Sequence, residues 1–179
     1  MPTILTHPAV PLALRLGFGR KTVSTRLLMV GIFASILPDL DVVAFRLGIP
    51  YAAEWGHRGF SHSLAFALLV AVIGAILARA QRTTAKRAFW FLFFAVASHG
   101  LLDAFTNGGL GIAFLWPIST ERFFLPWHPV EVAPLRLSRF LSQRGIEVLK
   151  SELIWIWAPC FGLALVVLIV RRVRGLVRR

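Results

Sequence analysis

The chain has 179 residues, of which 57% are hydrophobic and 16% are charged, and its mean hydropathy is +0.73. Soluble domains average about 45–50% apolar and about 25% charged residues, so this composition indicates a membrane protein. One membrane span takes about 20 apolar residues, which leaves room for about four or five crossings. The length therefore excludes a separate soluble domain.

Lys and Arg number 20 against 8 acidic residues, and the formal net charge is +12. In a soluble chain this excess would suggest nucleic-acid binding. In a membrane protein cations are expected at cytoplasmic loop ends, so nucleic acid is not the expected partner. The single cysteine, Cys160, lies in an apolar stretch, which excludes an internal disulfide and a cysteine-based zinc site.

The first expected element is a short helix over residues 7–19. It would descend from His7 on the outer side, with Pro8 in its first turn, where proline is tolerated, and glycine near its end. The alternative is an amphipathic segment on the cytoplasmic side. That alternative would leave His7 on the opposite face from the other candidate ligands.

Four apolar segments follow, and they predict spans over residues 24–37, 62–78, 88–105 and 153–170. Basic clusters at 20–26, 79–87 and 171–179 flank them, and the positive-inside rule places these clusters and the C-terminus in the cytoplasm. Residues 106–150 lack a long apolar run and contain four prolines, so an outer loop or cap is expected there. The expected fold is an all-α, polytopic bundle of four to five helices forming one integral membrane domain over residues 1–179.

The opposite ends of these segments all face outward, and they carry most of the imidazoles and several carboxylates. Charged groups at membrane depth are costly and usually line a functional cavity. His99 and Asp103, four residues apart, lie on one face of their helix. Imidazole and carboxylate ligands suit a catalytic divalent metal, zinc first, with manganese or magnesium as alternatives and one or two ions. The candidate ligands are His7, Asp39, Asp41, His57, His62, His99 and Asp103.

Structural readings of the same residues stay open. A His99–Asp103 hydrogen bond could simply pin two helices together. One aspartate after Pro38 could cap a helix, and Arg58 could neutralise the pair formed by Asp39 and Asp41. Each lone histidine could be an interfacial residue with satisfied hydrogen bonds.

Five short motifs, in this order, resemble those of the YdjM-like family, which is described as inner-membrane-associated metal-dependent hydrolases. The resemblance covers residues 6–126. That family is in turn similar to zinc-dependent phospholipase C and the fungal zinc nucleases, which implies ligands at His7, Asp39 or Asp41, His57 or His62, and His99 with Asp103. The motifs are LPDLD (37–41), HRGFSHSL (57–64), SHGLLDAFTNGG (98–109), LWP (115–117) and RFFLP (122–126).

The expected function is hydrolysis of a phosphoester in a lipid or lipid-linked substrate at the outer face of the bacterial cytoplasmic membrane. Asp39, Asp41 and Asp103 are the expected catalytic carboxylates, because one that is not a ligand would accept a water proton. Arg58 and Arg122 would bind phosphate through their forked guanidinium groups, with Thr106 beside them. The alternatives are a divalent-metal transporter or metal-sensing protein, and a non-catalytic membrane scaffold.

Overall fold

The computed structural model describes residues 1–134 and 136–177, and Arg178 and Arg179 of the basic tail lie outside this part. The described residues form helices and turns, and only two isolated β-bridges join other segments, Thr106 with Val130 and Ile112 with Phe123. The expected all-α class is therefore confirmed.

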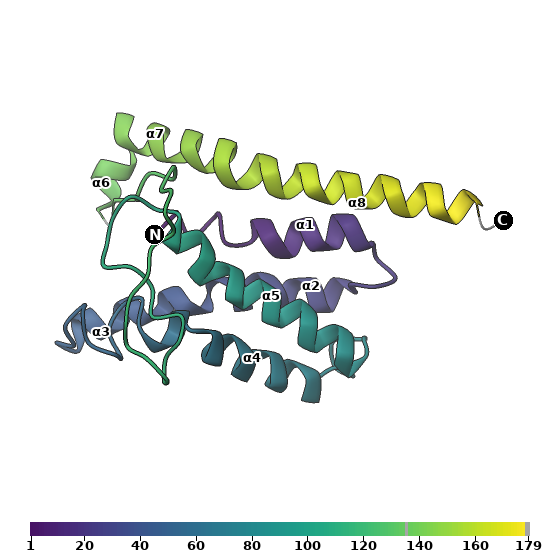
Figure 1. Ribbon diagram of the computed structural model, residues 1–179, viewed down its shortest axis with the longest axis horizontal. Helices are drawn as coiled ribbons and strands as arrows, with labels where there is room; N and C mark the ends of the chain where they lie inside the picture. Colours follow the sequence, from purple (N-terminus) through teal and green to yellow (C-terminus); the bar gives the residue numbers. More distant parts are fainter. Residues whose placement is uncertain (135, 178–179) are drawn as a thin grey trace.

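The helical elements follow the chain in the order shown in Figure 1. They are α1 (Ala9–Phe18), α2 (Thr25–Ile36), the 3-10 helix η1 (Leu37–Val42), α3 (Val43–Arg46), the 3-10 turn η2 (Phe60–His62), α4 (Leu64–Ile76), α5 (Ala85–Ala104), α6 (Leu137–Phe140), α7 (Gln143–Glu152), the π-helical turn η3 (Leu153–Trp157) and α8 (Ala158–Val177).

Short polar side chains define where the main helices begin. Ser24 caps α2 by accepting a hydrogen bond from the Leu27 amide, and Ser63 caps α4 through the Phe66 amide. Thr84 does the same for α5 through the Arg87 amide. Such caps satisfy amides that have no partner within the helix, and each contributes about 1 kcal/mol. The starts of three apolar helices are thus set locally.

The long helices lie side by side in Figure 1, with α5 packed against α1, α2 and α4 and with α8 running along α1. Buried apolar side chains fill the space between α2, α4 and α5, and Leu27, Ala67, Leu92 and Val96 are at most 3% exposed. This apolar core occupies the half of the bundle away from the candidate ligands. The ligands therefore lie at one end of the bundle.

Within the residues that the structure describes, two helical segments are long and apolar enough to cross a membrane, Thr25–Arg46 and Gln143–Gly175. The helices α1 and α4 are apolar but shorter. Length and hydropathy thus support two spans, and they do not establish the bundle of four to five crossings expected from the sequence.

The loop expected over residues 106–150 is shorter than predicted. The helix α6 and most of α7 lie within that range, and α7 continues through the π-helical turn η3 into α8. The apolar pattern revealed only the stretch 153–170 because α7 is amphipathic and carries charged residues on its exposed face. The last helix is therefore a continuous segment that reaches beyond the apolar run at both ends.

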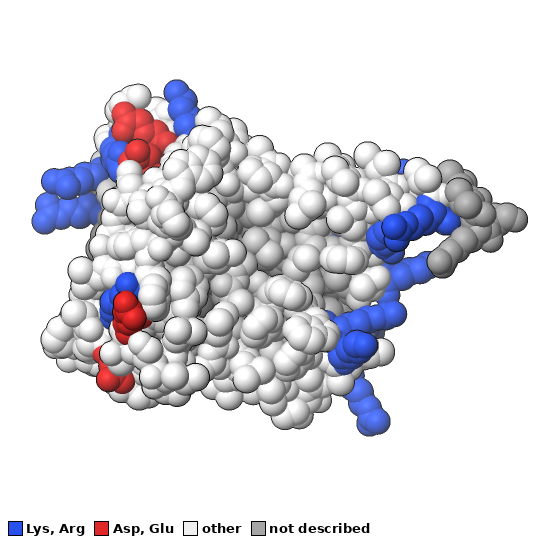
Figure 2. Space-filling model, in the orientation of Figure 1, with Lys and Arg blue, Asp and Glu red and all other residues white. Residues whose placement is uncertain are grey.

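Charge is distributed unequally over the two ends of the bundle. Figure 2 shows only Lys and Arg at the end where α8 finishes, whereas acidic and basic residues occur together at the opposite end and the surface between is almost uncharged. The basic end collects Arg20, Lys21, Arg26, Arg79, Arg82, Lys86, Arg87, Arg171, Arg172 and Arg174. The three basic clusters of the sequence therefore meet at one end.

Gly31 allows α2 to approach α5 closely, because a Cβ there would lie 2.3 Å from the Phe91 ring. We expect Gly31→Ala to lower the stability by about 1–3 kcal/mol through overpacking. Gly162→Ala in α8 is the matched control, because nothing lies within 4 Å of its added Cβ. Thermal unfolding in detergent measures both, and equal melting temperatures would contradict this packing.

Candidate metal centre

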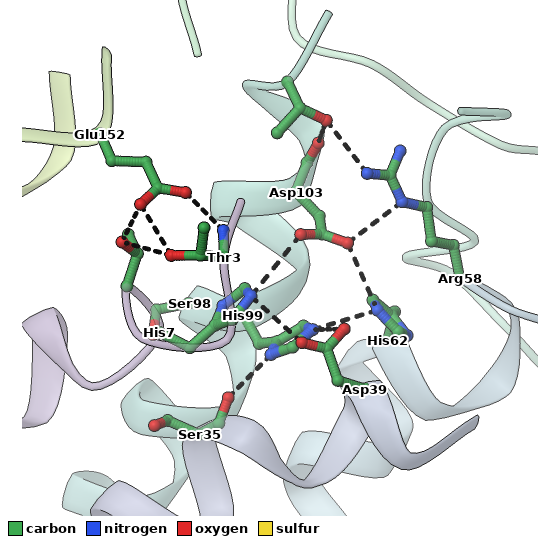
Figure 3. A network of polar contacts seen from close by, with 12 residues as sticks. Thr3, His7, Ser35, Asp39, Arg58, His62, Ser98, His99, Asp103 and Glu152 are labelled. Carbon is green, nitrogen blue, oxygen red and sulfur yellow. Dashed lines mark hydrogen bonds and ion pairs between the residues drawn. The ribbon is translucent and has the colours of Figure 1, made fainter. Parts of the chain in front are cut away.

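The candidate ligands come from four separate segments that end at the same place in the bundle. Figure 3 shows five of them close together, namely His7, Asp39, His62, His99 and Asp103. η1 extends α2 and positions the two aspartates, while the segment before α1 brings in His7. The turn that precedes α4 supplies two histidines, and the last turns of α5 supply a histidine and an aspartate. These residues are His7, Asp39, Asp41, His57, His62, His99 and Asp103.

Four of them form a compact buried group, namely Asp39, His62, His99 and Asp103. One ligand atom from each lies within 4.8 Å of the others. His99 Nε2 is 3.4 Å from Asp39 Oδ1, and His62 Nε2 is 3.4 Å from Asp103 Oδ2. All four residues are at most 4% exposed. The spacing of four residues between His99 and Asp103 does place both on one face of α5.

His7 joins this group from the other side. Its ring stacks on that of His99 with 3.6 Å between the centroids. Its Nε2 atom lies 3.6 Å from Asp39 Oδ2 and 3.8 Å from Asp103 Oδ1. The short first helix therefore starts beside the cluster, and His7 lies within reach of both carboxylates. We call these five residues the inner cluster.

Outer acceptors fix the tautomers of two histidines in the inner cluster. The Ser35 carbonyl lies 2.7 Å from His99 Nδ1, which must therefore carry the proton and donate it. Asp41 Oδ2 lies 3.2 Å from His62 Nδ1, so the proton of the neutral His62 ring lies on Nδ1 as well. When both rings are neutral, each Nε2 atom presents a lone pair, and these two atoms face each other at 3.1 Å. Two facing lone pairs repel unless a cation or a proton lies between them.

The polar atoms around this space confirm that the donor set fits a cation. Six buried atoms of His7, Asp39 and Asp103 have no hydrogen-bond partner within the described part of the chain. Buried carboxylates and imidazoles normally pair or coordinate metals, because unpaired burial is costly. These atoms are His7 Nδ1 and Nε2, Asp39 Oδ1 and Oδ2, and Asp103 Oδ1 and Oδ2.

Asp41 and His57 lie outside the inner cluster. Asp41 Oδ1 is 2.5 Å from His57 Nδ1, while Oδ2 accepts hydrogen bonds from Ser61 Oγ and the Arg58 amide. Asp41, His57 and His62 form a second group of potential ligands. The oxygens of Asp41 are already satisfied, however, so the observed contacts orient His57 and His62. A carboxylate behind a ligating imidazole is a common arrangement at metal sites.

Arg58 is fully buried, with a backbone φ of 64°. Its Nε is 3.1 Å from Asp103 Oδ2, and its other nitrogens donate to the Gly108 carbonyl and to Thr106 Oγ1. Gly109 leaves room for this guanidinium, because a Cβ there would lie 2.4 Å from Arg58 NH1. Binding of phosphate by Arg58 would require these nitrogens to leave Gly108 and Thr106.

Arg122 is placed differently from Arg58. Its guanidinium donates to the backbone carbonyls of Tyr51, Ala53 and His57, and it lies 5.9 Å from the centre of the Tyr51 ring. It thus holds the loop that precedes the histidine motif. Burial raises the pKa of Tyr51, which stays protonated at neutral pH and packs edge-on against His57.

The cap is joined to α7 by a polar network that the sequence did not reveal. Glu131 accepts a hydrogen bond from Asn107 and forms an ion pair with Arg144 at 2.7 Å. The Asn107 and Arg144 contacts hold the pKa of Glu131 below its usual value. Asn107 thus serves cap structure and lies outside the inner cluster.

Sequence reasoning also missed Ser35 and Glu152, as well as the contact of Ser61 with Asp41. Ser35 acts through its carbonyl, which any residue type could supply. Ser61 is visible within the histidine motif, but its partner Asp41 lies 20 residues away. Glu152 gave the clearest signal, since it is an acid directly before an apolar run, and it is buried beside the N-terminal segment.

The fold and the cluster define a helical membrane protein with a buried imidazole and carboxylate centre at one end of its bundle. The chain belongs to the family described as YdjM inner membrane protein, which it matches over residues 1–175. It is 47% identical over 160 residues to the inner membrane protein YbcI of Escherichia coli (strain K12), covering 89% of this chain and 92% of that relative. No solved structure matches it.

These matches confirm the resemblance found in the motifs between residues 6 and 126 and extend it to residue 175, in the last helix. They place the chain among bacterial inner membrane proteins. Both names describe a location and name no reaction, metal or substrate.

Proposed function

We propose that this protein is a metal-dependent hydrolase that cleaves a phosphoester of a lipid or lipid-linked substrate. The observation that carries the proposal is the inner cluster, in which carboxylate oxygens and imidazole lone pairs converge on one buried space. Such a donor set attracts a divalent cation, and zinc matches imidazole with carboxylate best. His7, His62, His99 and Asp103 would hold one ion, with Asp39 beside it. A bound divalent cation would polarise a phosphoryl oxygen and lower the pKa of water.

The protein residues would supply the proton acceptor and hold the histidine rings in place. Hydrolysis joins a water oxygen to phosphorus and breaks the bond from phosphorus to the leaving oxygen. A base must accept the proton of the attacking water, and the leaving oxygen takes up a proton in the end. Asp103 already balances the charge of Arg58, whereas Asp39 contacts only imidazoles. We therefore assign proton acceptance to Asp39. Asp41 acts behind the site by holding the rings of His57 and His62.

An apolar groove beside the inner cluster supports a substrate from the bilayer. The groove has a volume of about 700 Å³ and lies between α1, α5 and α8, with Val10, Leu14, Phe94, Leu101 and Leu163 among its lining residues. Val10 follows His7 by three residues, and Leu101 follows His99 by two. A hydrocarbon chain in the groove would bring an attached phosphate to the end of the bundle that holds the cluster.

The proposed topology has four to five crossings, with the cluster on the outer side of the cytoplasmic membrane and the C-terminus inside. The collection of ten basic residues at one end supports this orientation through the positive-inside rule. Transport is the weaker alternative, because the apolar core around Leu27, Leu92 and Val96 lies between the cluster and the basic end.

The orientation can be tested by cysteine labelling in a Cys160→Ser background. Ile118, which is 92% exposed in the cap, is expected to react from outside as Ile118→Cys. Arg79→Cys, in the exposed turn after α4, should react only after the membrane is permeabilised. The reverse pattern would move the proposed site to the cytoplasmic side.

Metal content tests the cluster directly. Purified protein should retain about one divalent ion, and His99→Gln or Asp103→Asn should lose most of it because each removes a ligand. His128→Gln is the control, since that exposed histidine packs on Phe124 away from the cluster. Elemental analysis measures the ion. Its absence, together with unchanged melting on addition of zinc, manganese or magnesium, would contradict a metal centre.

The variant Asp39→Asn tests the effect of this carboxylate on stability without metal and on activity with metal. After chelation we expect this variant to melt at a higher temperature than wild type, because it removes one of two carboxylates that face the same buried space. With metal restored, phosphate release from a panel of lipid phosphates and phosphodiesters should fall by about 100-fold or more. A stable, metal-loaded wild-type protein without activity on any of these lipids would favour a sensor or scaffold.

A further inference from the structure

Glu152, at the end of α7, is buried at 1% exposure and faces the segment that carries His7. Its Oε2 atom accepts hydrogen bonds from Thr3 Oγ1 at 2.8 Å and from Thr6 Oγ1 at 2.7 Å, and its Oε1 accepts one from the Thr3 amide. Figure 3 shows this carboxylate on the opposite side of His7 from Asp103. The two carboxylate oxygens thus receive three donors from residues 3–6.

The π-helical turn η3 explains why a second group from the same helix reaches Thr6. Trp157 Nε1 donates to Thr6 Oγ1 at 3.2 Å. On a regular α-helix, residues five apart point about 140° away from each other. A π-helical turn widens the helix by one residue, which brings Glu152 and Trp157 toward one face. The Thr6 hydroxyl therefore both donates to Glu152 and accepts from Trp157.

His7 depends on these contacts because its own ring has few restraints. Neither ring nitrogen has a hydrogen-bond partner within the described residues, and the ring is held by stacking on His99. Its backbone position is set by Thr6, whose amide donates to the Thr3 carbonyl and whose carbonyl accepts from the Ala9 amide, both at 2.9 Å. Anything that fixes Thr6 also fixes His7.

We propose that Glu152 is a positioning residue that holds His7 in the metal centre through Thr3 and Thr6, so that the last long helix supports the ligand from the first segment. This inference rests on the proposed metal function. Among the described residues, Glu152 is the one buried acid outside the histidine and aspartate motifs. Its proposed role is to orient His7 without touching metal or substrate.

The test compares variants that remove one hydroxyl or one charge. Thr6→Val keeps the shape of the side chain but loses the hydroxyl. Glu152→Gln replaces one of the two carboxylate oxygens that accept hydrogen bonds with an amide nitrogen. Competition with a chromogenic chelator measures the Zn²⁺ affinity, which should fall by about 10- to 100-fold in both variants, as is usual when a group that orients a ligand is lost. Thr6→Ser keeps the hydroxyl and should therefore bind Zn²⁺ with the affinity of wild type. Thr22→Val, at the basic end of the bundle, is the control.

A double-mutant cycle distinguishes positioning of His7 from general stability. In a His7→Ala background, Thr6→Val should cause no further loss of Zn²⁺ affinity, because the residue that it positions is gone. An equal loss in both backgrounds would overturn the proposal. So would an unchanged affinity in Thr6→Val and Glu152→Gln accompanied by a lower melting temperature.

A measurement without metal separates this inference from the proposed function. In chelated, histidine-labelled protein, the imidazole NMR signal of His7, assigned through His7→Ala, should shift or broaden in Thr6→Val while that of His128 stays fixed. If wild type binds no Zn²⁺ but this signal responds, the metal function fails and the positioning role stands. An unchanged His7 signal would overturn the positioning role whether or not Zn²⁺ binds.

Discussion

The constraint on which the structure depends is the convergence of carboxylate and imidazole groups in one buried space. Asp39 and Asp103 face that space together with the Nε2 atoms of His62 and His99. Without a cation or a shared proton these groups would repel one another, and the surrounding residues restrict their freedom to turn away. The Ser35 carbonyl and Asp41 fix the two rings, and Arg58 balances one carboxylate. A divalent cation would turn this repulsion into attraction.

The layer around the cluster links it to the cap. Arg58 binds Asp103 on one side and the Gly108 carbonyl and Thr106 on the other. Arg122 holds the loop before the histidine motif through three backbone carbonyls. Movement of the cap would therefore disturb the partners of Asp103 and His57. A substrate that displaces Arg58 from Gly108 would act on the cluster and on the cap at once.

The position of the cluster in the bundle fits chemistry at a membrane surface. The basic end, the apolar middle and the mixed-charge end in Figure 2 follow one another along the helices. The cluster lies at the mixed-charge end, above the apolar core and beside the groove between α1, α5 and α8. A phosphate linked to a hydrocarbon chain matches this arrangement, because the phosphate would meet the polar cluster and the hydrocarbon chain would meet the apolar groove.

Local patterns in the sequence determined the helical class, the caps at Ser24, Ser63 and Thr84, the segregation of basic residues, and the shared face of His99 and Asp103. Only the tertiary structure decided which groups each carboxylate contacts. Asp39 and Asp41 are two residues apart in a 3-10 helix, where side chains turn about 120° per residue, so they point in different directions and serve different groups. The roles of Glu152 and Arg58 likewise depend on partners 146 and 48 residues away. Side-chain partners so distant in the chain are set by how the helices pack, which no local pattern records.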